Sequence, residues 1–470
     1  MKFRNLKTGF LAAFLAILNL QVVSYAQNQP NIILIMADDL GYGDVGFNGN
    51  EIIKTPELDK MATQGLVFDR FYAAAPICSP TRGSCLTGRH PFRYGVLAAH
   101  SGGMRAGEIT IAEILKENGY RTGFFGKWHL GYVRPDAEQE DRGYYSPPWH
   151  HGFDLSFVTK SAVPTWNPSV TPPGWNAWNN YDGEIWSSSM YVMNGDLVQE
   201  NLKGDDSRVI MDRAIPFIEN TVQENRPFFT CIWFHTPHEP VVAGSEYKAL
   251  YSEYTDDAQN YYGAITAMDE QIGRLRNKLK QLGIDKNTIL WFTSDNGPSG
   301  HLVKPGIASA GKYRGSKHTV YEGGLRMPTV LEWSGKIMPG RTTYMSGTVD
   351  FLPTLVALAK VNFKFDDRPM EGINIEEAIF NNAKERPSPM AFGWMRLWAN
   401  IKSLVWTDNR YKLITYELKN QIELYDLIED PSETNNLAAE KKEKVQEMKK
   451  KLDEWEKSCQ LSRDGRDYRY

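Results

Sequence analysis

The chain of 470 residues has few cysteines, little net charge and a single long apolar run. Four cysteines cannot staple a chain of this length, so its fold must depend on a hydrophobic core, which 41% apolar residues can supply. A formal net charge of −4 provides no broad basic surface, which argues against nucleic acid as a partner. Any anion that this chain binds must therefore meet cations placed locally.

The long apolar run lies at the amino end. Basic residues within positions 1–7 precede an apolar stretch at 9–23, and residues 24–26 suit cleavage. This pattern is typical of a secretory signal peptide over residues 1–26. A membrane anchor is the alternative, but the run is shorter than the roughly 20 apolar residues that a membrane span requires. We expect a soluble, exported protein without a membrane span, located in the periplasm or alternatively outside the cell.

The few cysteines allow little cross-linking. Cys231 lies inside the apolar run PFFTCIWF and is expected in the core. If Cys78 is chemically modified, Cys85, Cys231 and Cys459 remain, which permit at most one disulfide and leave one thiol free. The sequence leaves open whether that disulfide forms.

Three apolar runs end in polar residues that suit a ligand site. NIILIMA precedes DD, PFFTCIWF precedes HTPHEP, and TILWFT precedes SDNG. Continuous apolar runs favour parallel strands buried on both faces, and ligands bind at the carboxyl ends of such strands. Helical stretches lie between the runs at 109–118, 207–222 and 257–282. The order predicts an α/β fold at 27–364, a large doubly wound mixed sheet flanked by helices.

Residues 365–470 are expected to form a small C-terminal α+β subdomain. The segments SLVWTDNRYKLITYE and IELYDLIEDP alternate like short antiparallel strands. A charged helix is expected at 436–457, after these strands.

The segment APICSPTRGSCLTGR at 75–89 combines a cysteine and an arginine at an expected helix start. Ser79 suits the N-cap and Pro80 the first helical position, which would put Cys78 beside the helix N-terminus. Free N–H groups there, with Arg82 one turn on, favour an anionic tetrahedral group. The alternative is a buried structural cysteine before an ordinary capped helix. A thiol phosphatase would need a wider spacing from cysteine to arginine, which neither Cys78 nor Cys85 has.

Oxygen ligands accompany this segment. Asp38, Asp39, Asp295 and Asn296 form an all-oxygen set with three negative charges, which suits a hard cation such as calcium. Each motif by itself is typical of a cap or a turn. Their pairing at two strand ends indicates a metal site.

CSPTR with GR, GKWHLG and YEGG, in this order, resembles the motifs of the type I, formylglycine-dependent sulfatases of the alkaline phosphatase superfamily. The resemblance extends from position 31 to ELYDLIEDPSETNNLA, nearly all of the mature chain. It implies that a formylglycine-generating maturation enzyme converts Cys78 to formylglycine. It also implies that Ca²⁺ is held by Asp38, Asp39, Asp295, Asn296 and the formylglycine side chain.

The resemblance further implies a catalytic role for several basic side chains. Lys127 would bind a sulfate oxygen, and Lys317, rather than Lys312, would bridge the sulfate and the leaving oxygen. His129 would take a proton from the formylglycine hydroxyl that does not attack. In a strand, the spacing of two would place Lys127 and His129 on the same side. Arg82, Lys127, Lys317 and calcium would supply positive charge to the transferring group.

Two histidines in HTPHEP compete for the role of leaving-group acid. The family pattern assigns it to His238, and His235 is expected to be structural; a pKa near 6.5 suits such proton donation. The implied reaction is attack of hydrated formylglycine on sulfur, release of the alcohol, and elimination of sulfate to restore the aldehyde. The alternatives are a phosphonate or phosphate ester hydrolase of the same superfamily, and an exported glycan-binding protein that has lost catalysis.

An aromatic, loop-like stretch between positions 144 and 191 is a candidate for sugar binding. Trp166, Trp175 and His151 are its candidate substrate-binding residues; the alternative is a loop that packs its tryptophans against the core. PPWHHGFD, VPTWNP and GDDSRVIMDRAIPFI resemble segments of polysaccharide sulfatases of marine bacteria. That resemblance implies a sulfated algal glycan as substrate, such as ulvan or a carrageenan.

Overall fold

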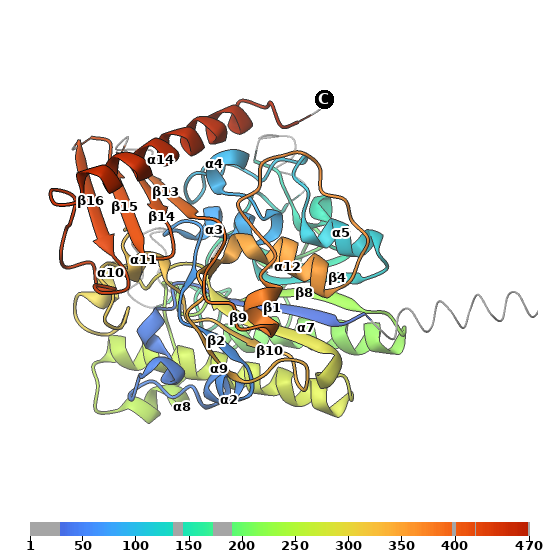
Figure 1. The fold of residues 1–470 in the computed structure, drawn as a ribbon. Helices are drawn as coiled ribbons and strands as arrows, with labels where there is room; N and C mark the ends of the chain where they lie inside the picture. Colours follow the sequence, from blue (N-terminus) through green and yellow to red (C-terminus); the bar gives the residue numbers. More distant parts are fainter. Residues whose placement is uncertain (1–28, 135–143, 173–189, 397–400, 419, 469–470) are drawn as a thin grey trace, which may run out of the picture.

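The computed structural model describes residues 29–134, 144–172, 190–396, 401–418 and 420–468. Among them a ten-stranded mixed sheet is flanked by helices, and a separate four-stranded antiparallel sheet with one long helix follows towards the C-terminus (Figure 1). The predicted fold class is confirmed. The expected signal peptide at 1–26 lies outside the described residues. No helix among the described residues is long and apolar enough to cross a membrane.

The large sheet has the order β11-β2-β10-β9-β1-β8-β4-β5-β6-β7. Its centre, β9-β1-β8-β4-β5, is parallel, and β10 joins β9 in antiparallel orientation. Its strands are β1 (Asn31–Ala37), β2 (Leu66–Phe68), β4 (Arg121–Lys127), β5 (Leu155–Thr159), β6 (Val192–Met193), β7 (Asp196–Leu197), β8 (Phe228–Trp233), β9 (Thr288–Ser294), β10 (Val330–Glu332) and β11 (Gly340–Thr342). β3 (Phe71–Tyr72) and β12 (Ser346–Gly347) form a separate parallel pair.

Central strand β1 packs its alternate side chains into two hydrophobic cores. Leu34 and Met36 lie in the core shared with α3, α5 and α12, whereas Ile33 and Ile35 lie in the core shared with α2, α7 and α9. Burial on both faces explains why the strand is apolar throughout. These helices are α2 (Pro56–Gln64), α3 (Cys78–Thr87), α5 (Ile111–Glu117), α7 (Asp206–Gln223), α9 (Asp256–Gln281) and α12 (Phe351–Leu358).

A side-chain cap fixes where α7 begins. Asp205 accepts from the N–H groups of Ser207 and Arg208 at 3.3 and 2.8 Å, so α7 begins at the next residue. Short helices connect the larger elements: η1 (Tyr42–Asp44), η2 (Gly46–Asn48), α4 (Pro91–Tyr94), η3 (Pro148–His151), α8 (Ser245–Lys248), η4 (Ala249–Tyr251), η5 (Asp285–Asn287), α10 (Gly300–Val303), α11 (Glu322–Leu325), η6 (Thr348–Asp350) and α13 (Glu376–Phe380).

The small sheet is the antiparallel meander β13 (Met390–Arg396), β14 (Ile401–Thr407), β15 (Tyr411–Tyr416) and β16 (Gln421–Asp426). Helix α14 (Lys442–Arg463) covers one face, where Leu452 packs against Leu413 and its neighbours (Figure 1). The opposite face packs against the loop that leads into α3. The helix predicted at 436–457 instead lies at 442–463, six residues later at each end, and residues 438–440 form a turn before it.

All four cysteines are buried and free, so the disulfide that the sequence left open is absent among Cys78, Cys85, Cys231 and Cys459. Cys231 is 0% exposed in β8, as expected of a core residue.

Candidate active site

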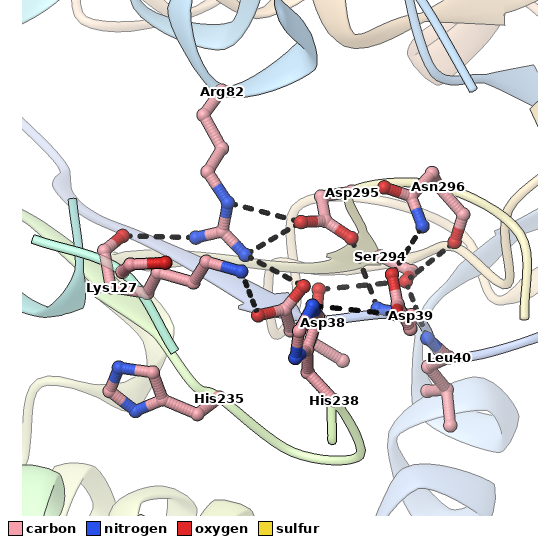
Figure 2. A network of polar contacts seen from close by, with 12 residues as sticks. Asp38, Asp39, Leu40, Arg82, Lys127, His235, His238, Ser294, Asp295 and Asn296 are labelled. Carbon is pink, nitrogen blue, oxygen red and sulfur yellow. Dashed lines mark hydrogen bonds and ion pairs between the residues drawn. The ribbon is translucent and has the colours of Figure 1, made fainter. Parts of the chain in front are cut away.

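The polar residues predicted at strand ends meet at one edge of the large sheet. Asp38 and Asp39 follow β1, Asp295 and Asn296 follow β9, and the HTPHEP segment follows β8. The ends are joined by hydrogen bonds: Asp39 N donates to Asp295 Oδ1 at 3.1 Å, and Leu40 N to Ser294 Oγ at 3.0 Å (Figure 2). Parallel strands end at a common edge, which is why residues more than 250 positions apart become neighbours.

The acidic centre, defined as Asp38, Asp39, Asp295 and Asn296, is fully enclosed. Exposure is 3% for Asp39 and 0% for the other three. Asn296 Nδ2 donates to Asp39 Oδ1 at 2.6 Å, but Asn296 Oδ1 accepts no hydrogen bond, and neither does Asp38 Oδ1, whose nearest cation is Arg82 Nη2 at 3.5 Å. Buried oxygens without a donor are costly unless a cation meets them. The donor set therefore fits a hard cation such as calcium.

Three cationic side chains, those of Lys127, Lys317 and Arg82, neutralise the three carboxylates of the acidic centre. Lys127 Nζ donates to Asp38 Oδ2 at 2.6 Å, and Lys317 Nζ to Asp39 Oδ2 at 2.8 Å. Burial alone would raise the pKa of Asp38, but the positive charges around it, that of Lys127 foremost, together outweigh burial and hold that pKa well below its usual range. The cluster is thus balanced without a metal, and a divalent cation would give it the positive charge that suits an anionic substrate.

Arg82 braces the acidic centre from α3. Its Nε and Nη2 donate to Asp295 Oδ2 at 3.0 and 2.7 Å, and its Nη1 donates to the Lys127 carbonyl at 3.0 Å (Figure 2). Burial and the charge of Asp38 nevertheless raise the pKa of Asp295 to about 7. The donors of Arg82 bond protein acceptors, so its direct contribution is to position Asp295. Its positive charge also acts on the site without a direct contact to the substrate.

Cys78 is itself the first residue of α3, and Ile77 is the N-cap. The predicted cap at Ser79 is therefore wrong by two positions, and the Ser79 hydroxyl makes no hydrogen bond. Cys78 is 2% exposed, and burial raises the pKa of its thiol although Lys127 acts in the opposite direction. As encoded, this thiol is a weak nucleophile, since the thiolate is the reactive form.

The spacing of two predicted that Lys127 and His129 lie in one strand. The structure places only Lys127 in a strand. β4 ends at Lys127, and His129 has a left-handed backbone with φ 57°. Its ring is 5% exposed, and neither ring nitrogen has a hydrogen-bond partner. Burial, followed by the charge of Lys127, lowers its pKa well below the usual value. A buried imidazole with free nitrogens is suited to exchange a proton with a bound group.

The two histidines of HTPHEP have different surroundings. His235 is buried, with Nδ1 2.8 Å from Asp206 Oδ2 and Nε2 2.7 Å from Thr159 Oγ1, which is a structural arrangement. His238 lies at the acidic centre, with Nε2 3.8 Å from Asp39 Oδ2 and Nδ1 2.6 Å from the Glu239 carbonyl (Figure 2). Burial and the charge of Lys127 lower the pKa of His238 to about 4, below the value near 6.5 that the sequence suggested.

Two neighbours of the site were not found from the sequence. The His100 ring lies 4.6 Å from the His129 ring, and the Lys160 carbonyl accepts from His129 N at 3.1 Å. No motif marks either position, because each reaches the site through loop geometry. Lys312, the less favoured alternative to Lys317, is exposed, with its ammonium 5.8 Å from the centroid of the Tyr313 ring.

Of the three predicted substrate-binding residues, the structure describes His151 and Trp166. His151 is 1% exposed, and its Nε2 lies 2.7 Å from Ser146 Oγ, so it is a core residue and the assignment to substrate is wrong. Trp166 is half-buried, with its ring near Gly244, and stays a prediction. Trp175 lies outside the described residues.

Residues 30–361 match the Sulfatase family. The chain belongs to the sulfatase family. Residues 313–458 of this sulfatase also match the family described as N-sulphoglucosamine sulphohydrolase, C-terminal. Arylsulfatase A from Bos taurus is 33% identical over 369 residues, which cover 76% of this chain and 69% of that protein. N-acetylgalactosamine-6-sulfatase from Mus musculus is 32% identical over 366 residues, which cover 74% of this chain and 66% of that protein.

Solved structures share the fold of this sulfatase. Ps i-CgsB in complex with k-i-k-neocarrahexaose superposes with a TM-score of 0.81 at 27% identity, covering 93% of this chain and 94% of that chain. The PsFucS1 sulfatase from Pseudoalteromonas sp. has a TM-score of 0.74 at 21% identity over 93% of this chain and 92% of that chain, a likeness that shows the fold alone.

Proposed function

We propose that this sulfatase releases sulfate from a sulfated algal polysaccharide or oligosaccharide, of the carrageenan or ulvan type. The observation that carries the proposal is the likeness over 93% of the chain to a structure solved with a neocarrahexaose. Ulvan as the substrate is supported by sequence resemblance alone. We also propose export to the periplasm or the cell exterior through a signal peptide at 1–26, a catalytic domain at 27–364 and a C-terminal subdomain at 365–470.

The acidic centre would hold Ca²⁺, with Cys78 as formylglycine completing the ligand set. Calcium would supply positive charge for the sulfate oxygens. Formylglycine, formed from Cys78 by the maturation enzyme, would supply a hydrated aldehyde as the nucleophile towards sulfur. The weak nucleophilicity of the buried thiol supports a modified residue over the encoded cysteine.

The lysines would stabilise negative charge, and the histidines would transfer protons. Lys127 and Lys317 bring ammonium groups to the edge of the acidic centre, where they would stabilise charge on the sulfate oxygens. The contact of His238 Nδ1 with a carbonyl leaves Nε2 as the atom that would carry the proton to the leaving oxygen. His129, with both nitrogens unbonded, would accept a proton as sulfate departs.

The test combines protein chemistry with kinetics on enzyme made in a host that has the maturation enzyme. Mass spectrometry of the peptide containing Cys78 should show formylglycine, and Cys78→Ala should abolish turnover. Free sulfate should appear from carrageenan or ulvan oligosaccharides with a higher kcat/KM than from 4-nitrocatechol sulfate. An unmodified thiol in fully active enzyme would exclude formylglycine. Faster hydrolysis of an aryl phosphonate than of the aryl sulfate would favour the phosphonate hydrolase, and no sulfate from any glycan would reject the substrate class.

A further inference from the structure

Lys160 lies at the same sheet edge as the active site, although no motif includes it. It is the residue after β5, which pairs in parallel with β4, the strand that ends at Lys127. Its carbonyl accepts a hydrogen bond from His129 N at 3.1 Å. The backbone of Lys160 is thereby fixed beside one of the residues proposed to move a proton.

Within the part of the chain that the structure describes, no carboxylate neutralises the ammonium of Lys160, unlike those of Lys127 and Lys317. Lys127 and Lys317 each contact a carboxylate of the acidic centre, at 2.6 and 2.8 Å. Lys160 is half-buried and makes no ion pair with another described residue. Its Nζ lies 3.9 Å from the centroid of the Tyr132 ring, a cation–π contact that holds the ammonium in place without a carboxylate from the described part of the chain.

Two further features beside Lys160 suit a sugar. The Tyr132 ring packs 6.0 Å from that of Tyr144, which is 37% exposed, so aromatic faces adjoin the ammonium. His100 is exposed as a residue, but its ring packs against that of His129, with centroids 4.6 Å apart, which shields the imidazole from water on that side. Burial, followed by the charges of Lys127 and Lys160, lowers the pKa of His100 to about 4, so its imidazole is neutral at pH 7 and can bond a hydroxyl.

We propose that Lys160, with Tyr132 and His100, forms a second subsite that binds another anionic group of the glycan while its reacting sulfate lies at the acidic centre. The inference depends on the proposed function, because only a polyanionic substrate would place a second charge there. The bound group is a sulfate or a carboxylate on the same or a neighbouring sugar. Lys160 would then favour substrates with two anionic groups over those with one, since its ammonium contacts the second anion and not the reacting sulfate.

The test measures inhibition of 4-nitrocatechol sulfate hydrolysis by matched oligosaccharides, so it works whether or not they are cleaved. One pair is κ-type and ι-type neocarrabiose, which differ by one sulfate. A second pair is a sulfated disaccharide with a uronic acid and its carboxyl-reduced form. The variants are Lys160→Ala and Lys160→Arg, with Lys54→Ala as control because Lys54 also lies over a tyrosine ring, 5.6 Å from the Tyr251 centroid.

We expect the second anion to lower Ki about tenfold in the wild type, the size of one charge-assisted contact. Lys160→Ala should remove that preference and leave kcat/KM for the aryl sulfate within about twofold, because the backbone bond to His129 persists. Lys160→Arg and Lys54→Ala should keep the preference.

Two kinds of result would overturn the subsite: a wild type that does not distinguish the pairs, or a Lys160→Ala variant that keeps the preference. A collapse of aryl sulfate turnover in Lys160→Ala would also overturn it, since Lys160 would then support His129. Sulfate release from the same oligosaccharides is recorded separately. Inhibition therefore tests the subsite, and sulfate release tests the glycan function, so the failure of one is distinguished from the failure of the other.

Discussion

The Asp295 carboxylate has two roles, since it pairs with Arg82 and also belongs to the acidic centre. Asp295→Asn, compared with a variant that loses only a buried ion pair, therefore separates metal binding from folding. Oδ2 accepts two hydrogen bonds from Arg82, at 3.0 and 2.7 Å, and Oδ1 accepts one from Asp39 N at 3.1 Å. Asp295→Asn keeps the shape but removes the charge. Arg82, which is 0% exposed, would keep its bond to the Lys127 carbonyl, but Asp38, at 3.5 Å, would be its one remaining anionic partner among the described residues. Breaking a buried ion pair costs about 3–5 kcal/mol, so a clear loss of stability is expected.

A second buried pair provides the matched control. Asp350 is 1% exposed and accepts from Arg386 Nη1 and Nη2 at 2.7 and 2.9 Å. Asp350→Asn should lower the free energy of unfolding by a similar amount, about 3–5 kcal/mol. It leaves the acidic centre intact, so metal content and turnover should persist at temperatures where the variant is folded.

The two variants should differ in calcium dependence and in rate. An ion that binds only the folded state at a hundred times its Kd adds about 2.7 kcal/mol of stability. This increment should be present in the wild type and Asp350→Asn and absent in Asp295→Asn. Turnover of Asp295→Asn should fall at least about 10³-fold, equivalent to about 4 kcal/mol of barrier.

The assay is calorimetric unfolding with excess calcium and with EDTA, alongside metal analysis and initial rates on 4-nitrocatechol sulfate. If Asp295→Asn retains stoichiometric calcium and a tenth or more of the wild-type rate, then Asp295 is not a ligand and the acidic centre is a structural ion-pair cluster. If both variants lose activity equally, the loss reports folding alone.

Two further predictions concern residues away from the chemistry. Burial lowers the pKa of His151 from 6.5 to about 3, so below pH 6.5 only the unfolded chain takes up this proton and stability falls by about 1.4 kcal/mol per pH unit. His151→Gln, which can keep the bond to Ser146, should flatten the decline of Tm between pH 6.5 and 4; parallel curves would contradict this. Lys412→Met should lower the free energy of unfolding in urea by about 3–5 kcal/mol, because Glu322 and Glu433, each 2.9 Å from Lys412, lose a buried partner. A loss below about 1 kcal/mol would show that the carboxylates find other partners.

The sequence by itself determined the central strands and the edge at which polar residues gather. NIILIMA was predicted as a strand and forms β1 with the same bounds, and the helices predicted at 207–222 and 257–282 differ from α7 and α9 by one residue at each end. These features depend on local patterns: continuous apolar runs and caps are read from adjacent residues. The neighbourhood of Asp38 and Asp295 followed from the rule that parallel strands end together.

Only the tertiary structure decided which groups pair and which remain open. Arg82 and Asp295 meet across 213 positions, so no local pattern could show that the guanidinium is engaged by a carboxylate. The aromatic stretch concealed β5, whose neighbour Lys160 became part of the site edge, and His151 proved to be buried. Hydrogen-bond partners and burial are set by elements distant in the chain. The sequence therefore specifies the types of reactive residue, whereas packing fixes their partners, their exposure and their charge.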